Sequence, residues 1–144
     1  MALTAPKISS SSPIQFSIPL PHAPQTRIHV HLTILQTSVM AFLTTTGEST
    51  TRALSSMGSF VYSLPNRDHP TEQPISTPLY IDAGTVDFAS RLAKALARRV
   101  GKPVYVGSSV SFSSAGRGGD VEEEMEGFRA AVDAIARVVT TREE

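Results

Sequence analysis

The chain of 144 residues contains no cysteine, and its formal net charge at pH 7 is zero. The missing cysteines exclude disulfides, thiol nucleophiles and cysteine-ligated metals. Because the charge is balanced, the molecule as a whole has no attraction to nucleic acid or to an anionic membrane, so an electrostatic partner must recognise a local patch. Hydrophobic residues make up 40% of the chain, which suits one globular domain with its own core.

Long apolar runs are absent as well. No stretch approaches the ~20 apolar residues that cross a bilayer. Asn66, the only asparagine, is followed by Arg-Asp rather than by a glycosylation signal. We therefore expect a protein of the cytoplasm and the nucleus that has no membrane partner.

Acidic residues are missing from the first 47 positions, which include the run SSSSP at 9–13. Organelle transit peptides share this composition, but they are usually rich in arginine, whereas the basic residues here are only Lys7 and Arg27. A disordered tail over residues 1–12, leading into a single domain over 13–140, is the simpler interpretation.

Two alternating segments, RIHVHLTIL at 27–35 and SVMAFLTT at 38–45, predict a strand hairpin. A two-residue turn at Gln36 and Thr37 sets its register, whereas a three-residue turn would move the side chains of the second strand to the other face. The two-residue turn predicts a core face on which Ile34 lies opposite Val39, Leu32 opposite Ala41 and Val30 opposite Leu43.

The other face of this hairpin collects His29, His31, Thr33, Met40 and Phe42. A small monomer does not ordinarily leave such a semi-apolar surface in contact with water. We therefore predict that a second body covers it and that these five residues contribute to a dimer interface.

Four further segments complete the predicted sheet and its connections. In chain order they are an edge strand at 13–20, a strand at 53–64 with Gly58 as a bulge or point of close approach, a mobile proline-rich loop at 63–78 with a short extended piece at 75–80, and a strand at 104–112 that rejoins the sheet.

Apolar residues at helical spacing predict two helices. The first covers 87–100 and ends at Gly101, just before Pro103. The second begins at Asp120, which forms a capping box with Glu123. Its apolar stripe is Val121, Met125, Phe128, Val132, Ile135 and Val139. We predict an α+β fold, with a single antiparallel β-sheet, two α-helices packed on one face and the opposite face used for dimerisation.

The helix at 87–100 has a basic surface formed by Arg91, Lys94, Arg98 and Arg99. It suits a solvated face, a contact with an acidic protein surface, or a nucleic-acid-binding module. Nucleic acid is disfavoured because no aromatic residues are interleaved with these cations and the net charge is zero. A solvated face and a contact with a protein both stay open, and Arg91, Arg98 and Arg99 are the candidate residues for contact with a protein client, with no nucleic acid partner.

Signals for catalysis are weak. His29 and His31 share a strand face and could bind a metal in a small metal-dependent enzyme, but a third ligand would have to come from His22, Asp68 or His69 in loops. No serine lies in a GxSxG elbow. The glycine loop at 116–119 matches neither the Walker pattern nor GxGxxG, the two sequence patterns that bind phosphate. We predict no catalytic residue, no cofactor and no bound metal.

Three segments together resemble the proteasome assembly chaperone 4 family. RLAKALARRVGKPVYVGSSV is similar to that family's helix, turn and strand, IHVHLTILQTSVMAFL to its hairpin, and EEEMEGF to the acidic start of its final helix. The resemblance covers roughly residues 14–128. The serine-rich N-terminus, the 63–78 loop and the glycine loop depart from it.

The resemblance implies a function in binding rather than catalysis. It implies a heterodimer with a paralogous proteasome assembly chaperone 3, which binds an α subunit of the 20S core particle and promotes assembly of the α-ring. The heterodimer is then expected to leave when β subunits arrive. An antiparallel sheet with two helices on one face is the fold that the resemblance implies.

Overall fold

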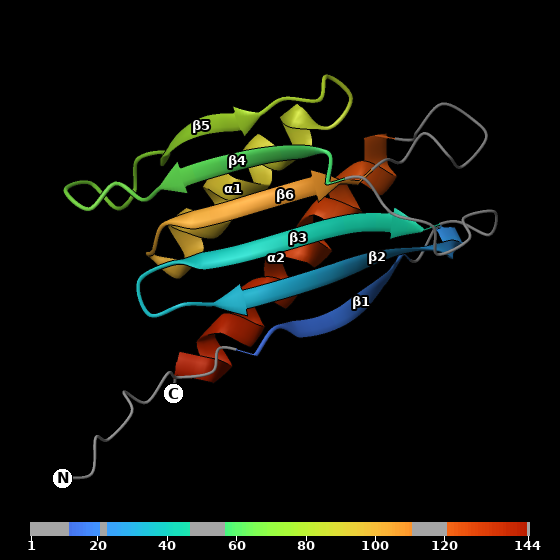
Figure 1. Ribbon diagram of the computed structural model, residues 1–144, viewed down its shortest axis with the longest axis horizontal. Coiled ribbons are helices and arrows are strands. Elements are labelled where there is room, and N and C mark those ends of the chain that lie inside the picture. The colour runs from blue at the N-terminus through green and yellow to red at the C-terminus, as the bar shows by residue number, and fades with distance from the viewer. Residues whose placement is uncertain (1–11, 21–22, 47–56, 111–120, 144) are drawn as a thin grey trace, which may run out of the picture.

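The structure is a computed structural model that describes residues 12–20, 23–46, 57–110 and 121–143. The predicted tail at 1–12 falls almost wholly outside this part of the chain, as do the glycine loop and Asp120. In chain order the elements are β1 Ile14–Leu20, β2 Ala23–Ile34, β3 Val39–Thr46, β4 Ser59–Leu64, β5 Ile75–Tyr80, α1 Val86–Val100, β6 Val104–Ser109 and α2 Val121–Glu143 (Figure 1).

The six strands form one sheet in the order β1-β2-β3-β6-β4-β5. The prediction of a single sheet with two helices is confirmed, but the prediction that the sheet is wholly antiparallel is wrong, because β6 runs parallel to β3. Helix α1 returns the chain from β5 so that β6 enters between β3 and β4, antiparallel only to β4. Alternation reports which face a side chain occupies and says nothing of strand direction, so the sequence pattern could not reveal this pairing.

The hairpin of β2 and β3 has the predicted register. Ile34 pairs with Val39, Leu32 with Ala41 and Val30 with Leu43. The Leu35 N–H donates to the Ser38 carbonyl at 2.9 Å, which closes the turn over Gln36 and Thr37. The three pairs are part of the hydrophobic core, apart from the partly buried Ile34 that packs against it.

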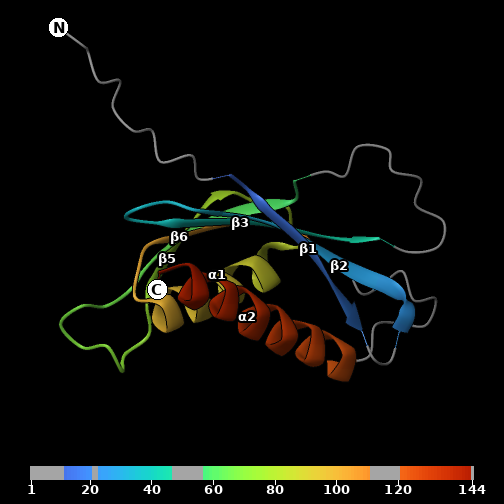
Figure 2. The same cartoon turned by 90° about the horizontal axis from the view of Figure 1, so that it is seen from below.

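Both helices cover the same face of the sheet (Figure 2). Helix α1 packs against β4, β5 and β6, α2 packs against β1 and β2, and the two helices contact each other. The core between the layers is apolar, and its largest fully buried side chains include Ile28, Leu32, Leu92, Leu96 and Ile135. No described helix is long and apolar enough to cross a membrane.

The ends of α1 follow from identifiable residues. Gly101 has φ +73°, and its N–H donates to the Ala97 carbonyl at 2.9 Å, so the helix ends where the sequence predicts. At the other end, the Thr85 hydroxyl does not cap the helix. It accepts from the Ser59 N–H at 3.1 Å, and the two hydroxyl oxygens are 2.8 Å apart. This buried pair ties the start of α1 to β4.

Gly58 precedes β4 and was predicted to be a bulge or a point of close approach. Its φ is +72°, and a Cβ atom built there would lie 2.1 Å from the carbonyl oxygen of Ser108. The close approach is confirmed, and it lets β4 begin directly against β6. The strand is described from Ser59, so the predicted start at 53 lies outside the described residues.

Two other boundaries differ from the sequence-based expectations. The irregular loop is narrower than 63–78, because β4 continues to Leu64 and β5 begins at Ile75. Within it, Asn66 Oδ1 accepts hydrogen bonds from the N–H groups of Asp68 and His69, at 3.2 and 3.0 Å. On α2, Met125 was predicted to belong to the apolar stripe but is 48% exposed, whereas Val132, Ile135 and Val139 are buried.

Candidate partner-binding face

The side of the sheet that the helices leave uncovered, called the open face here, carries a row of aromatic side chains. The rings of Phe42 and Phe60 are stacked with centroids 6.0 Å apart, and those of Phe60 and Tyr105 are stacked at 5.9 Å. Tyr62 and Tyr105 lie 4.6 Å apart in a tilted arrangement. All four side chains are partly exposed. We call these four residues the aromatic row.

Strand alternation and strand order together create the aromatic row. In β4, Ser59, Val61 and Ser63 are buried against α1, which turns Phe60 and Tyr62 outward. In β6, Val104 and Val106 face the helices, so Tyr105 turns outward beside Tyr62, its partner in the register. The sheet order places β6 between β3 and β4 and so brings Phe42 near them.

Gly107 is the residue that allows the rings of Phe42 and Phe60 to stack. It pairs with Phe42 across β3 and with Phe60 across β4, so it lies between the two rings. A Cβ atom at Gly107 would lie 2.5 Å from Cδ1 of Phe42. The missing side chain therefore leaves the space in which the Phe42 ring lies.

The apolar character of the open face continues over the edge strand β5. Leu64 lies opposite Ile75, and Phe60 lies opposite Tyr80. Ile75 is 68% exposed and Tyr80 60% exposed. Monomeric proteins rarely leave a contiguous surface of this kind in water. The pairing of β4 with β5 has a register shift at Phe60/Val61, and β5 contains Pro78, so the outer edge of β5 is a poor template for a further strand. The exposed side chains, rather than the strand edge, are therefore suited to binding.

The half of the open face over β1 and β2 is polar. His31 Nδ1 accepts a hydrogen bond from Gln15 Nε2 at 3.2 Å. His29 Nε2 shares a hydrogen bond of 2.6 Å with the Thr46 hydroxyl, and Arg27 donates to the Ser17 hydroxyl at 3.0 Å. These side chains hydrogen-bond to one another at the surface, where they can also exchange hydrogen bonds with a partner.

A hollow of about 660 Å³ lies where the two halves meet, lined by residues that include His29, His31, Phe42, Met57 and Gly107. It combines an apolar wall with two imidazoles. The described residues include no group of three or more histidine, aspartate or glutamate side chains placed to hold a metal ion. Of the third ligands considered from the sequence, Asp68 and His69 belong to the loop after β4, and His22 lies outside the described residues.

The structure places all five residues of the predicted dimer surface on the open face. His31 lies directly opposite Phe42, and Thr33 opposite Met40. His29 is exposed, and the other four are partly exposed. Sequence reasoning did not select Phe60, Tyr62 or Tyr105. The alternation within FVYSL and VYVG was visible, but only the order of the strands shows that these rings adjoin Phe42.

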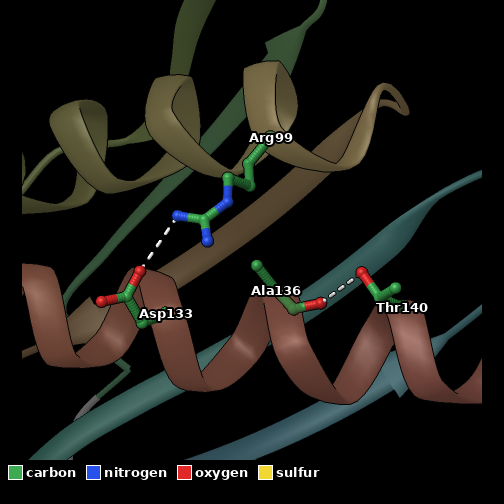
Figure 3. Close-up of polar contacts among 4 residues, drawn as sticks. All are labelled: Arg99, Asp133, Ala136 and Thr140. Atoms are coloured by element: carbon green, nitrogen blue, oxygen red, sulfur yellow. Dashed lines mark hydrogen bonds and ion pairs between the residues drawn. The ribbon is translucent and has the colours of Figure 1, made fainter.

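The three arginines predicted to contact a client have different surroundings. Arg91 donates to Glu124 at 2.9 Å and Arg99 to Asp133 at 3.0 Å, so both join α1 to α2. Figure 3 shows the second of these pairs. Arg98 has no ion pair among the described residues and lines a hollow beside the loop after β4. Client binding by these residues stays a prediction.

Comparisons with known proteins agree with one another. A family model described as proteasome assembly chaperone 4 matches residues 27–110. Among solved structures, the fold is similar to a chain in the crystal structure of a chaperone complex for yeast 20S proteasome assembly, with a TM-score of 0.60 and 18% sequence identity over 90% of this chain and 95% of that one. At this identity the similarity concerns the fold alone. No curated protein matches the chain by sequence.

Proposed function

The chain belongs to the proteasome assembly chaperone 4 family, a family without catalytic activity, and on that basis we propose that it forms a heterodimer with a paralogous proteasome assembly chaperone 3. The heterodimer binds a 20S α subunit and promotes assembly of the α-ring in the cytoplasm and the nucleus. The open face is the proposed surface for the paralogue.

One observation carries this proposal most directly. The aromatic row lies on the uncovered face of a sheet whose other face packs against the two helices. Each aromatic side chain removed from water contributes favourable free energy in proportion to its apolar area, about 25 cal/mol per Å². A sheet of similar size laid over this one would cover the row, the exposed apolar residues of β5 and the hollow. An interface of roughly 2,000 Å² or more is expected for such a permanent pair.

The two halves of the open face have different parts in this pairing. The aromatic row and β5 contribute apolar area, which has little directional preference. The polar half offers His29, His31 and Gln15, whose hydrogen bonds favour a partner with complementary groups at those positions. Apolar burial would thus provide most of the affinity, and the polar half would restrict which partner and which orientation are accepted.

The chaperone acts by binding and not by chemistry. Holding an α subunit in one orientation makes the next correct subunit more able to join than an incorrect one, and no covalent step is needed. The client interface is expected to be smaller than the heterodimer interface, because the chaperone has to leave.

Co-expression with a candidate chaperone 3 and with each 20S α subunit in turn, followed by native mass spectrometry, tests the proposal. The expected species are a 1:1 chaperone pair and a ternary complex with one of the α subunits. Tyr105→Arg places a charge in the middle of the aromatic row and should abolish the pair.

Met125→Arg is the matched control for Tyr105→Arg, since Met125 is an exposed apolar residue on α2, in the helix layer. It should leave the chaperone pair intact. A chain that stays monomeric with chaperone 3 and binds no α subunit would refute the proposal. Stoichiometric metal that is lost in a His29→Ala, His31→Ala double variant would instead favour the metal-dependent enzyme.

A further inference from the structure

Helices α1 and α2 run parallel to each other. Arg91 pairs with Glu124 and Arg99 with Asp133, so eight residues along α1 correspond to nine along α2 in the same direction. Both C-terminal ends therefore lie at one end of the helix layer, at the left in Figure 1 and again in Figure 2.

Arginines gather at this end, on three separate segments. Arg98 and Arg67 line a hollow of about 220 Å³ between the end of α1 and the loop after β4. Arg99 and Arg137 line a second hollow, of about 540 Å³, along the two helices. Arg142 lies in the last turn of α2. We call Arg67, Arg98, Arg99, Arg137 and Arg142 the basic end.

Acidic residues concentrate at the opposite end of the helix layer. Asp87 lies in the first turn of α1, and Glu123, Glu124 and Glu126 lie near the start of α2. The chain has a formal net charge of zero, but its helix layer has one acidic and one basic end. The basic end is not uniformly positive, because Asp133 and Glu143 belong to α2, and Asp68 and Glu72 belong to the loop after β4. A partner therefore has to match a pattern of arginines and carboxylates rather than a large local net charge.

Helix dipoles account for part of this arrangement but not for all of it. Cations stabilise the last turn of a helix, which explains Arg98, Arg99 and Arg142. Arg67 belongs to a loop, and the effect of the dipole falls off before it reaches Arg137. Within the described residues only Arg99 of the five has an ion pair. Four guanidinium groups are therefore available to a partner.

We propose that the basic end docks an acidic segment of a protein. Because this inference rests on the proposed function, the segment is assigned to the 20S α subunit that the heterodimer binds. The planar fork of arginine pairs with a carboxylate through two hydrogen bonds, and several such pairs guide encounter and fix orientation.

A protein suits this surface better than a nucleic acid does. Asp133 and Glu72 stand among the arginines and line the same two hollows, and they would repel a continuous row of phosphates. The aromatic row, on which bases could stack, lies on the open face, on the far side of the sheet from the helices. Separate carboxylates can alternate with Asp133 and Glu72 in a way that a phosphate backbone cannot.

The location also permits both partners to bind at once. The basic end belongs to the helix layer and to a loop at its edge, whereas the paralogue is proposed to cover the open face. A client at the basic end would therefore not compete with the paralogue. The two surfaces can be tested independently for the same reason.

The experiment uses the full-length heterodimer with chaperone 3 and each purified 20S α subunit in turn, with association followed by biolayer interferometry. The Arg98→Glu, Arg137→Glu double variant should reduce the association rate constant for the bound α subunit at least about tenfold. The same variant should form the heterodimer as the wild type does. The wild-type rate should also fall as salt is raised from about 0.05 to about 0.3 M.

The Lys94→Glu, Arg129→Glu double variant is the matched control. It also changes one residue on each helix and alters the net charge equally, but both positions lie in the middle of the helices, so the association rate should stay within about twofold of the wild type. An Arg98→Gln, Arg137→Gln variant, which only removes charge, should give an intermediate loss and replaces the reversal variant if that one does not fold.

Three results would overturn the inference. Normal α-subunit binding by an intact Arg98→Glu, Arg137→Glu heterodimer would exclude the basic end and leave the proposed function standing. An equal loss of association rate in the Lys94→Glu, Arg129→Glu control would show that the effect comes from the overall charge and not from the basic end. A wild-type heterodimer that ignores every α subunit, but binds a single-stranded oligonucleotide through Arg98 and Arg137, would refute the proposed function and the inference together.

Discussion

Phe42 and Phe60 belong to strands that are not neighbours, and yet their rings are stacked with centroids 6.0 Å apart. The strand between them contributes Gly107 at this position, and any larger residue would meet the Phe42 ring. The continuity of the aromatic row therefore depends on a residue that has no side chain.

Gly107→Ala tests that dependence. The added Cβ atom would lie 2.5 Å from Phe42 Cδ1, so the ring has to move. Because Phe42 is partly exposed, the free energy of unfolding should fall by only about 1 kcal/mol, whereas affinity for the paralogue should fall about tenfold or more. Urea unfolding and a pull-down titration measure the two. Gly84→Ala is the control, since its Cβ atom would meet only Asp82 Oδ1 at 4.0 Å. Equal losses of stability in both variants would contradict the prediction.

Gly58→Ala and Gly101→Ala form a second matched pair, because the two glycines have nearly the same positive φ, +72° and +73°. Gly101 has open space around its Cβ position, so the substitution should cost only about 1 kcal/mol of conformational strain. At Gly58 the Cβ atom meets the Ser108 backbone as well, and the cost should reach about 3 kcal/mol or more. Chemical denaturation measures both, and similar costs would show that the contact with Ser108 relaxes freely.

Ser59 and Thr85 should be coupled energetically. Their hydroxyl oxygens are 2.8 Å apart and buried, and Ser59 Oγ also donates to the Asp82 carbonyl at 3.0 Å. Ser59→Ala or Thr85→Val alone leaves a buried polar group without its partner and should cost about 1–3 kcal/mol. The double variant should cost less than the sum of the two, as a double-mutant cycle in urea would show. Strict additivity would mean that the two hydroxyls do not support each other.

The ion pair between Arg99 and Asp133 should add little to stability. Its side chains are 56% and 58% exposed, so water and salt screen the attraction. A double-mutant cycle with alanine at both positions should give a coupling of about 0.5 kcal/mol or less, falling further in 1 M salt. A coupling that persisted at high salt would indicate an interaction shielded from solvent.

The sequence predicted what depends on local pattern. The Gln36-Thr37 turn determined the hairpin register, and therefore which of Met40 and Ala41 on the second strand faces the core. The stop at Gly101 was equally local. The parallel pairing of β3 with β6 was not predictable in this way, because it depends on how α1 crosses the sheet. The aromatic row and the pairing of Arg91 and Arg99 with α2 were missed for the same reason, since they join segments whose proximity only the topology establishes.

The insertion of β6 between β3 and β4 has a consequence for synthesis on the ribosome. The strand that joins the two halves of the sheet, β1 to β3 and β4 to β5, is the last of the six to emerge. Until it does, Phe42 and Phe60 belong to separate pieces, and pairing over such sequence distances is slow. A nascent or truncated chain thus has no assembled aromatic row to offer a paralogue. The proposed partner-binding face is therefore complete only once the last strand has joined the sheet.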